Sequence, residues 1–183
     1  MGVKILALDV GFASAGMAVM DLLGGRAELF HTECLHTKPE AKKRGIYVAH
    51  DDVRRTAYLT REILRVYLDN SCKGPVVELP SAGAQGAKAN RCMGIATGMI
   101  AAMVELVRCP AEWITPQESR TAAIGRATAP KGEDVKKLVM AAMAGKYPEI
   151  AALRKADQEH IADALATYEA AKDRQMIRTL EQI

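Results

Sequence analysis

The first 36 residues carry the hydrophobic pattern of three β-strands joined by short turns. Apolar residues dominate 3–10 and 15–21, and they recur through 26–36. The segment Leu23-Gly24-Gly25-Arg26 is a strong hairpin signal, because paired glycines adopt the backbone angles of a tight turn. We therefore expect an antiparallel meander at the start of the chain.

Beyond residue 36 the pattern predicts a polar, basic loop and then helices that alternate with two short strands. A meander followed by strand–helix crossovers predicts an α/β fold, with a five-stranded mixed sheet flanked by helices on both faces. We expect one domain over 1–183. The strands are predicted at 76–80 and 111–114, and the helices at about 51–70, up to about 107, 116–125, 133–144 and from about 157, with a charged end at 172–183 that frays.

Within these helices the sequence predicts caps and packing faces. Asp51 or Asp52 is expected to cap the first helix, and Asp157 is a candidate cap of the last one. Gly94 and Gly98, one turn apart, indicate close packing against the sheet rather than against a second subunit. The expected apolar faces consist of Val53, Ala57, Leu64 and Leu68 in the first helix, and of Met93, Ala96, Ile100, Met103 and Val107 in the second.

Composition bears on possible partners, membrane association and the state of the cysteines, but it does not identify the function. A net charge of +3 permits an anionic partner but does not demand one. We see no apolar run as long as a membrane span and no charged-then-apolar leader, so we expect a soluble intracellular protein. The four cysteines have no paired spacing, which is typical of reduced thiols.

His31, Cys34 and His36 raise the question of a zinc site. On a strand, however, residue 31 points to the opposite face from residues 34 and 36, and no fourth ligand is near in the sequence. We therefore expect no zinc here.

Two acids stand at the ends of apolar strands, where an ionised carboxylate is costly unless a cation holds it. Asp9 lies inside the first strand, before Gly11, and Glu78 lies near the end of the strand 76–80. Asp9 either caps its strand by bonding to turn amides or binds a divalent cation. The second interpretation needs further carboxylates nearby.

His160 and Asp163 are three residues apart and share one face of the last helix. If neighbouring strands bring Asp9 and Glu78 together, this helix can lay both side chains across them. Three carboxylates and one imidazole suit Mg²⁺ or Mn²⁺, and two such ions can promote phosphodiester hydrolysis. Equally, His160 can cap or pack in the core, and Asp163 can be a solvated helix residue.

The order of the acid motifs resembles that of the RuvC family of Holliday-junction resolvases. The motifs are strand-Asp9-x-Gly11…Gly16, then Val77-Glu78, then His160-x-x-Asp163-Ala164-Leu165-Ala166. A second resemblance to that family lies in the segment Ile114-Thr115-Pro116…Arg120-Thr121…Gly125…Lys131…Val135-Lys136…Val139. Residues 78–85 resemble the divergent phage-type branch of the family. The likeness extends from residue 3 to about residue 170.

The resemblance implies an RNase H-like fold and a homodimer that cleaves branched DNA, a four-way junction, by paired nicks. Asp9, Glu78 and Asp163 would be catalytic metal-binding carboxylates, and His160 a fourth ligand or a proton shuttle. Two Mg²⁺ or Mn²⁺ ions per site would leave 5′-phosphate and 3′-hydroxyl ends. The resemblance further implies a role in DNA recombination and repair, in the cytoplasm of a bacterial or phage-infected cell.

One departure concerns substrate specificity. Many family members have an aromatic residue after the second acid, whereas Leu79-Pro80-Ser81-Ala82 has none, and the chain has only one Trp, five Tyr and two Phe. We therefore expect a looser specificity for branched DNA.

Basic residues near the acids are candidates for binding DNA phosphates. We expect Lys88, Arg91, Arg120 and Lys131 to do so, with Lys42, Lys43 and Arg44 as a weaker group. Three alternatives stay open: an RNase H-like nuclease acting on RNA, an ATP-binding domain of the actin and sugar-kinase type, and a junction-binding protein without catalysis.

Overall fold

The computed structural model describes residues 2–40, 47–80 and 86–182, and its centre is a five-stranded mixed sheet. The strand order is β3-β2-β1-β4-β5. The first three strands pair antiparallel, and β4 and β5 continue the sheet in parallel with β1. This confirms the predicted α/β fold. The strands are β1 (Val3–Val10), β2 (Ser14–Leu23), β3 (Arg26–His36), β4 (Gly74–Glu78) and β5 (Glu112–Ile114).

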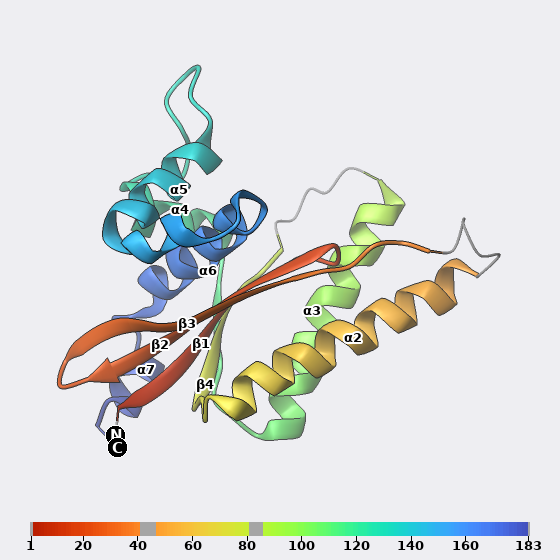
Figure 1. Ribbon diagram of the computed structural model, residues 1–183, viewed down its shortest axis with the longest axis horizontal. Coiled ribbons are helices and arrows are strands. Elements are labelled where there is room, and N and C mark those ends of the chain that lie inside the picture. Colours follow the sequence, from red (N-terminus) through yellow and green to blue (C-terminus); the bar gives the residue numbers. More distant parts are fainter. Residues whose placement is uncertain (1, 41–46, 81–85, 183) are drawn as a thin grey trace.

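Helices cover both faces of the sheet (Figure 1). Two long helices lie on one face, and a cluster of shorter ones lies on the other. The first group is α2 (Val48–Asp69) and α3 (Ala87–Val107); the second is α4 (Pro116–Ile124), α5 (Val135–Lys146), the 3₁₀ helix η1 (Pro148–Ala152), α6 (Lys155–Ala171) and α7 (Gln175–Leu180).

Strand alternation produces two separate cores. In β1, Ile5 and Ala7 face α5 and α6, whereas Leu6 and Leu8 face α2 and α3. All four side chains are fully buried. A strand buried on both faces reads as a continuous apolar run, which is why β1 was recognisable from the sequence.

The structure of α2 differs from the expected one in its N-cap and in its buried face. It begins at Val48 behind an N-cap Tyr47 that makes no side-chain cap, so neither Asp51 nor Asp52 caps it. Val53 and Leu68 are 67% and 57% exposed, so the expected apolar face is wrong. The true buried face includes three charged residues, which a search for apolar spacing passes over. That face consists of Asp51, Asp52, Arg55, Leu59, Ile63, Val66 and Tyr67.

Arg55 explains how a charge can occupy the core face. Its guanidinium donates to the backbone oxygen of Phe12 at 2.9 Å and to the hydroxyl of Thr37 at 3.0 Å. It also lies 4.1 Å from the centre of the Phe12 ring. These contacts replace water around the buried cation.

Helix α3 also departs from expectation. A Cβ added to Gly94 or Gly98 would meet nothing within 4 Å, so these glycines do not mediate packing on the sheet. Its buried residues are Ala96, Met99, Ile100 and Met103. Over Ala87–Val107 the helix has the length and apolar composition of a membrane span, contrary to the expectation that no such run exists, with 22% of that window buried.

The structure of the C-terminal region differs from the sequence-based expectation. Arg154, not Asp157, is the N-cap of α6, and Asp157 is buried in its first turn. The segment between the helices predicted at 133–144 and from about 157 contains η1, and Ile150 of η1 is buried. The charged end forms α7 rather than fraying, because Ile177 and Leu180 pack into the core beside α6.

Candidate active site

Strand pairing brings the two strand-end acids together. β1 and β4 are parallel neighbours, with Leu8 opposite Val77. Asp9 and Glu78 follow these partners directly, so they lie side by side at the same edge of the sheet. The structure thus provides the juxtaposition that the sequence left conditional.

Helix α6 supplies the other two predicted residues, and a glycine lets it come close enough. A Cβ on Gly16 of β2 would lie 2.1 Å from the backbone oxygen of His160, a distance that no real contact allows. Only glycine at this position permits α6 to rest directly on the sheet. His160 and Asp163 then extend over the strand ends.

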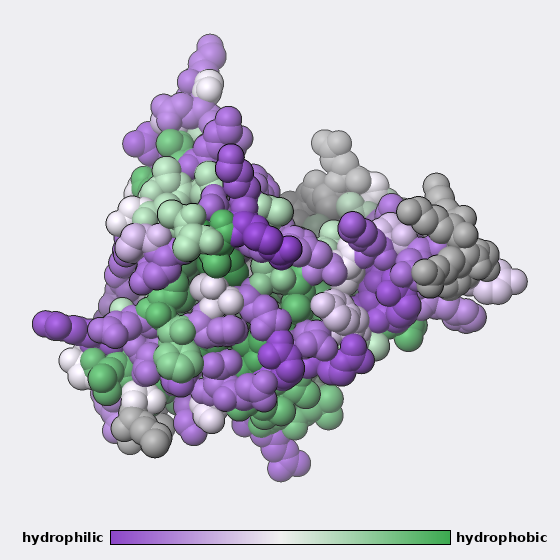
Figure 2. Space-filling view, in the orientation of Figure 1, coloured by the Kyte–Doolittle hydropathy of each residue, from purple (hydrophilic) through white to green (hydrophobic). Residues whose placement is uncertain are grey.

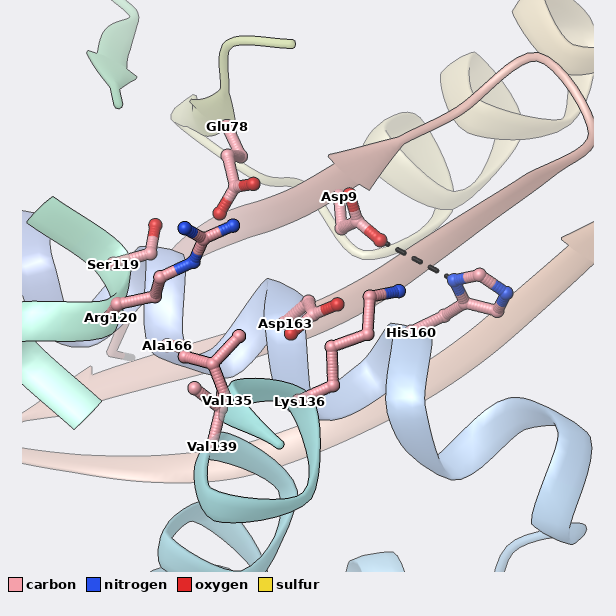
Figure 3. A pocket seen from close by; sticks show the side chains of 10 residues that line it. All are labelled: Asp9, Glu78, Ser119, Arg120, Val135, Lys136, Val139, His160, Asp163 and Ala166. Atoms are coloured by element: carbon pink, nitrogen blue, oxygen red, sulfur yellow. Dashed lines mark hydrogen bonds and ion pairs between the residues drawn. The ribbon is translucent and has the colours of Figure 1, made fainter. Parts of the chain in front are cut away.

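The four predicted residues line one pocket of about 180 Å³ (Figure 3). In the close-up, Glu78 and Asp9 come from the sheet, while His160 and Asp163 come from α6. Arg120 of α4 points toward Glu78, and Lys136 of α5 reaches between Asp163 and His160. The remaining lining residues are Ser119, Val135, Val139 and Ala166.

The pocket brings three carboxyl groups together in a largely buried space. Burial, followed by the negative charges of Asp9 and Glu78, raises the pKa of Asp163 to about 7. Burial also raises the pKa of Glu78, with Asp9 adding to the effect. The surroundings of these carboxyl groups therefore oppose their ionisation, which a bound cation would favour.

His160 is paired with Asp9. Its Nδ1 lies 3.4 Å from an oxygen of Asp9. This hydrogen bond raises the pKa of His160 in spite of the ring's burial. The imidazole therefore tends to hold its proton beside the acid cluster, which qualifies it as a proton donor.

Three pocket neighbours were not identified as site residues from the sequence. The hydroxyl of Thr167 lies 3.5 Å from Glu78 and 3.4 Å from the hydroxyl of Ser119. Lys136 forms an ion pair with Glu159 beside the pocket. Thr167 lies four residues after Asp163, on the same helix face, and this spacing was the available signal.

The predicted DNA-binding residues divide into two groups. Arg120 lines the pocket, and Lys88, Arg91 and Lys131 do not. Lys88 and Lys131 are exposed, and Arg91 forms a 3.1 Å ion pair with Asp52 of α2. The weaker candidates Lys42, Lys43 and Arg44 lie outside the described residues, as does most of the motif at 78–85.

The donor set fits a hard divalent cation. Three carboxylates and an imidazole line the pocket, and burial together with neighbouring acids opposes the ionisation of Asp163. Among the described residues, the pocket acids form no group of three whose ligand atoms lie within 4.8 Å of one another. Carboxylate oxygens are the ligands that Mg²⁺ prefers, and this ion binds through one or two of them with water or phosphate oxygens as its other ligands.

Comparison with known proteins gives a match in structure alone. No family model matches the sequence. No curated protein matches it either. The fold is similar to Thermus thermophilus RuvC in complex with Holliday junction substrate (TM-score 0.70, 21% identity, 97% of each chain). A second Thermus thermophilus RuvC structure gives a TM-score of 0.65 at 23% identity over 92% of each chain.

A viral protein of this fold class is also similar. The fowlpox virus Holliday junction resolvase matches with a TM-score of 0.57 and 9% identity, over 93% of this chain and 98% of that one. These likenesses confirm the RNase H-like fold that the sequence motifs implied.

Proposed function

We propose that this chain is a divalent-cation-dependent endodeoxyribonuclease that resolves four-way DNA junctions and other branched DNA by paired nicks. One observation carries the proposal: three acids distant in sequence converge on a single pocket, where burial and mutual repulsion raise the pKa of Asp163. The similarity to proteins solved with Holliday junction DNA supports the choice of substrate. We further propose that residues 1–183 work as one domain.

Asp9, Glu78 and Asp163 would hold one or two Mg²⁺ or Mn²⁺ ions, with His160 at the side of the site. When bound, such ions supply a water nucleophile and neutralise charge on the phosphodiester. His160, kept protonated by Asp9, donates its proton to the departing 3′-oxygen. The products are 5′-phosphate and 3′-hydroxyl ends.

Cations around the pocket would position the DNA. Arg120 points into the pocket, and we expect it to contact the phosphate that is cleaved. Lys131 lies on the segment between α4 and α5, which projects from the body of the protein (Figure 1). Hydrophilic side chains cover this projection (Figure 2). Lys88, and Arg91 once released from Asp52, would add phosphate contacts from the start of α3.

Paired nicks on a symmetric junction require two pockets, so we propose a homodimer acting in the cytoplasm of a bacterial or phage-infected cell. The lack of an aromatic residue at Leu79 and Pro80 supports a specificity for branch shape rather than for base sequence.

The test is digestion of fixed four-way, three-way, flap and linear duplex DNAs, beside an RNA–DNA hybrid, in Mg²⁺. We expect symmetric nicks near the branch point of the four-way junction and weaker cleavage of the other branched DNAs. Asp9→Asn should retain junction binding and lose cleavage. Cleavage of the hybrid with intact junctions would replace this proposal by an RNA-directed nuclease, and cleavage by Asp9→Asn would refute the site assignment.

A further inference from the structure

A second cluster of ligand-type side chains lies near the acid pocket but contributes nothing to it. Among the residues that the structure describes, Cys34, His36 and Asp157 are the one group of three metal-ligand types whose donor atoms all lie within 4.8 Å of one another. Cys34 Sγ lies 3.5 Å from His36 Nε2, and His36 Nε2 lies 2.7 Å from Asp157 Oδ1. Residues 121 positions apart in sequence thus meet at one point.

The fold explains how this cluster assembles. Cys34 and His36 alternate along β3 and therefore project from the same face of this edge strand. Cys34 is paired in register with Gly16, the residue that allows α6 to contact the sheet. The first turn of α6, which carries Asp157, therefore lies against the face of β3 from which Cys34 and His36 project.

We propose that Cys34, His36 and Asp157 form a Zn²⁺ site that joins β3 to the start of α6. One thiolate, one imidazole and one carboxylate are three of the ligand types that Zn²⁺ binds, and three protein ligands leave a fourth position for water. A sulfur ligand disfavours Mg²⁺ and Mn²⁺, which select oxygen. The two sites of this protein would therefore take chemically different cations.

The surroundings of the cluster are consistent with this assignment. Arg154 Nε bonds to Asp157 Oδ2 at 2.7 Å, which leaves Oδ1 directed at His36. His31, on the other face of β3, pairs with Glu33 instead and takes no part. The local spacing of His31, Cys34 and His36 contains no signal for a ligand from α6, which is why the sequence alone did not indicate zinc.

The site lies beside the catalytic helix. The rings of His36 and His160 are 6.0 Å apart in an edge-to-face arrangement. A cation that bridges β3 and α6 would restrain the helix that presents His160 and Asp163 to the pocket. Binding to the folded state alone would also raise the melting temperature.

The test uses the purified full-length protein, freed of metal by chelation and titrated with Co²⁺ and then Zn²⁺. We expect a thiolate-to-cobalt charge-transfer band that saturates at one Co²⁺ per chain and that one equivalent of Zn²⁺ abolishes, and a higher melting temperature with Zn²⁺. Cys34→Ser should abolish the band and the thermal shift. His36→Gln should weaken Zn²⁺ affinity by at least about tenfold.

Two matched variants serve as controls. Cys92→Ser removes a partly buried thiol on the other face of the sheet, and His31→Gln removes an imidazole from the opposite face of β3. Both should bind Co²⁺ and Zn²⁺ as the wild type does. A band that survives in Cys34→Ser, an equal loss in the controls, or no Zn²⁺ binding by the wild type would each overturn the proposal. These measurements contain no DNA, so their result is independent of the proposed nuclease activity.

Discussion

The buried acids of α2 and the acids of the pocket differ in how their charge is held. On α2, Asp51 is bonded to Arg54 at 2.7 Å and Asp52 to Arg91 at 3.1 Å. The hydrogen bonds from Arg54 lower the pKa of Asp51. Across the sheet, burial and neighbouring acids raise the pKa of Asp163 to about 7.

This difference separates structural from functional charge. A buried acid paired with one cation serves packing, whereas grouped acids whose ionisation is opposed by burial and by one another destabilise the fold and favour the binding of a cation. Neutralising an acid of α2 and neutralising an acid of the pocket should therefore have opposite effects on the stability of the protein.

The largest difference should appear in catalysis. We expect Glu78→Gln to reduce nicking of a four-way junction by at least about 100-fold, because a metal-binding carboxylate stabilises the transition state by several kcal/mol. Asp52→Asn, which changes a buried acid of the other layer, should stay within about threefold of the wild type. Single-turnover cleavage rates in Mg²⁺ measure both, and equal losses would remove the distinction between the layers.

Two glycine substitutions compare how the layers pack. Gly16→Ala forces a methyl group into the backbone of α6 and should destabilise the protein by about 1–3 kcal/mol while slowing cleavage. Gly98→Ala adds a methyl group to an open part of α3 and should stabilise it by about 0.5–1 kcal/mol. Chemical denaturation gives both values, and a neutral Gly16→Ala would show that α6 does not need this close approach.

Neutralising one acid in each layer should shift stability in opposite directions. Because the folded pKa of Asp163 exceeds that of the unfolded chain, wild-type stability falls as the pH rises from about 4 to about 7. At pH 8 in a chelator, Asp163→Asn should gain roughly 1–4 kcal/mol, and this gain should vanish below about pH 4.

Asp51→Asn should show the reverse behaviour. The lowered pKa of Asp51 stabilises the folded state above the ordinary carboxyl range, and this stabilisation is lost as the pH falls through the folded pKa. The variant should therefore be less stable than the wild type at pH 8 and approach it in acid. Denaturation curves across this range compare the pair, and two variants with the same sign would contradict the account.

The smallest effect should come from DNA contacts. Arg120→Ala should weaken junction binding by about 3- to 10-fold and reduce the slope of log affinity against log salt by about 1. Arg61→Ala, on α2, removes an exposed cation that is paired with Glu62 and should change neither quantity. Fluorescence anisotropy at several salt concentrations tests this, and an unchanged slope for Arg120→Ala argues against a phosphate contact.

The sequence predicted what depends on local pattern. The strands of the meander, the crossover order and the start of α4 at Pro116 follow from short-range signals, and the structure confirms them. The grouping of Asp9 with Glu78 depended on their strands being neighbours, a condition that the sequence left open and that the register meets.

Features that depend on distant contacts were not predictable. The buried face of α2 includes Arg55, whose partner is a backbone oxygen 43 residues away. The pairing of His36 with Asp157 joins the edge strand to α6, and neither residue has a local signal for the other. The role of Gly16 becomes apparent only when α6 is in place.

We infer that the clustered acids of the pocket bind divalent cations. Electron paramagnetic resonance of free Mn²⁺, titrated with wild type, Asp163→Asn, Asp51→Asn and Cys34→Ser at pH 8, measures this binding directly. We expect Mn²⁺ to bind and Mg²⁺ to displace it, with the Mn²⁺ affinity at least about tenfold weaker in Asp163→Asn and unchanged in the other two variants. Equal Mn²⁺ affinity in the wild type and Asp163→Asn would refute this role of the pocket.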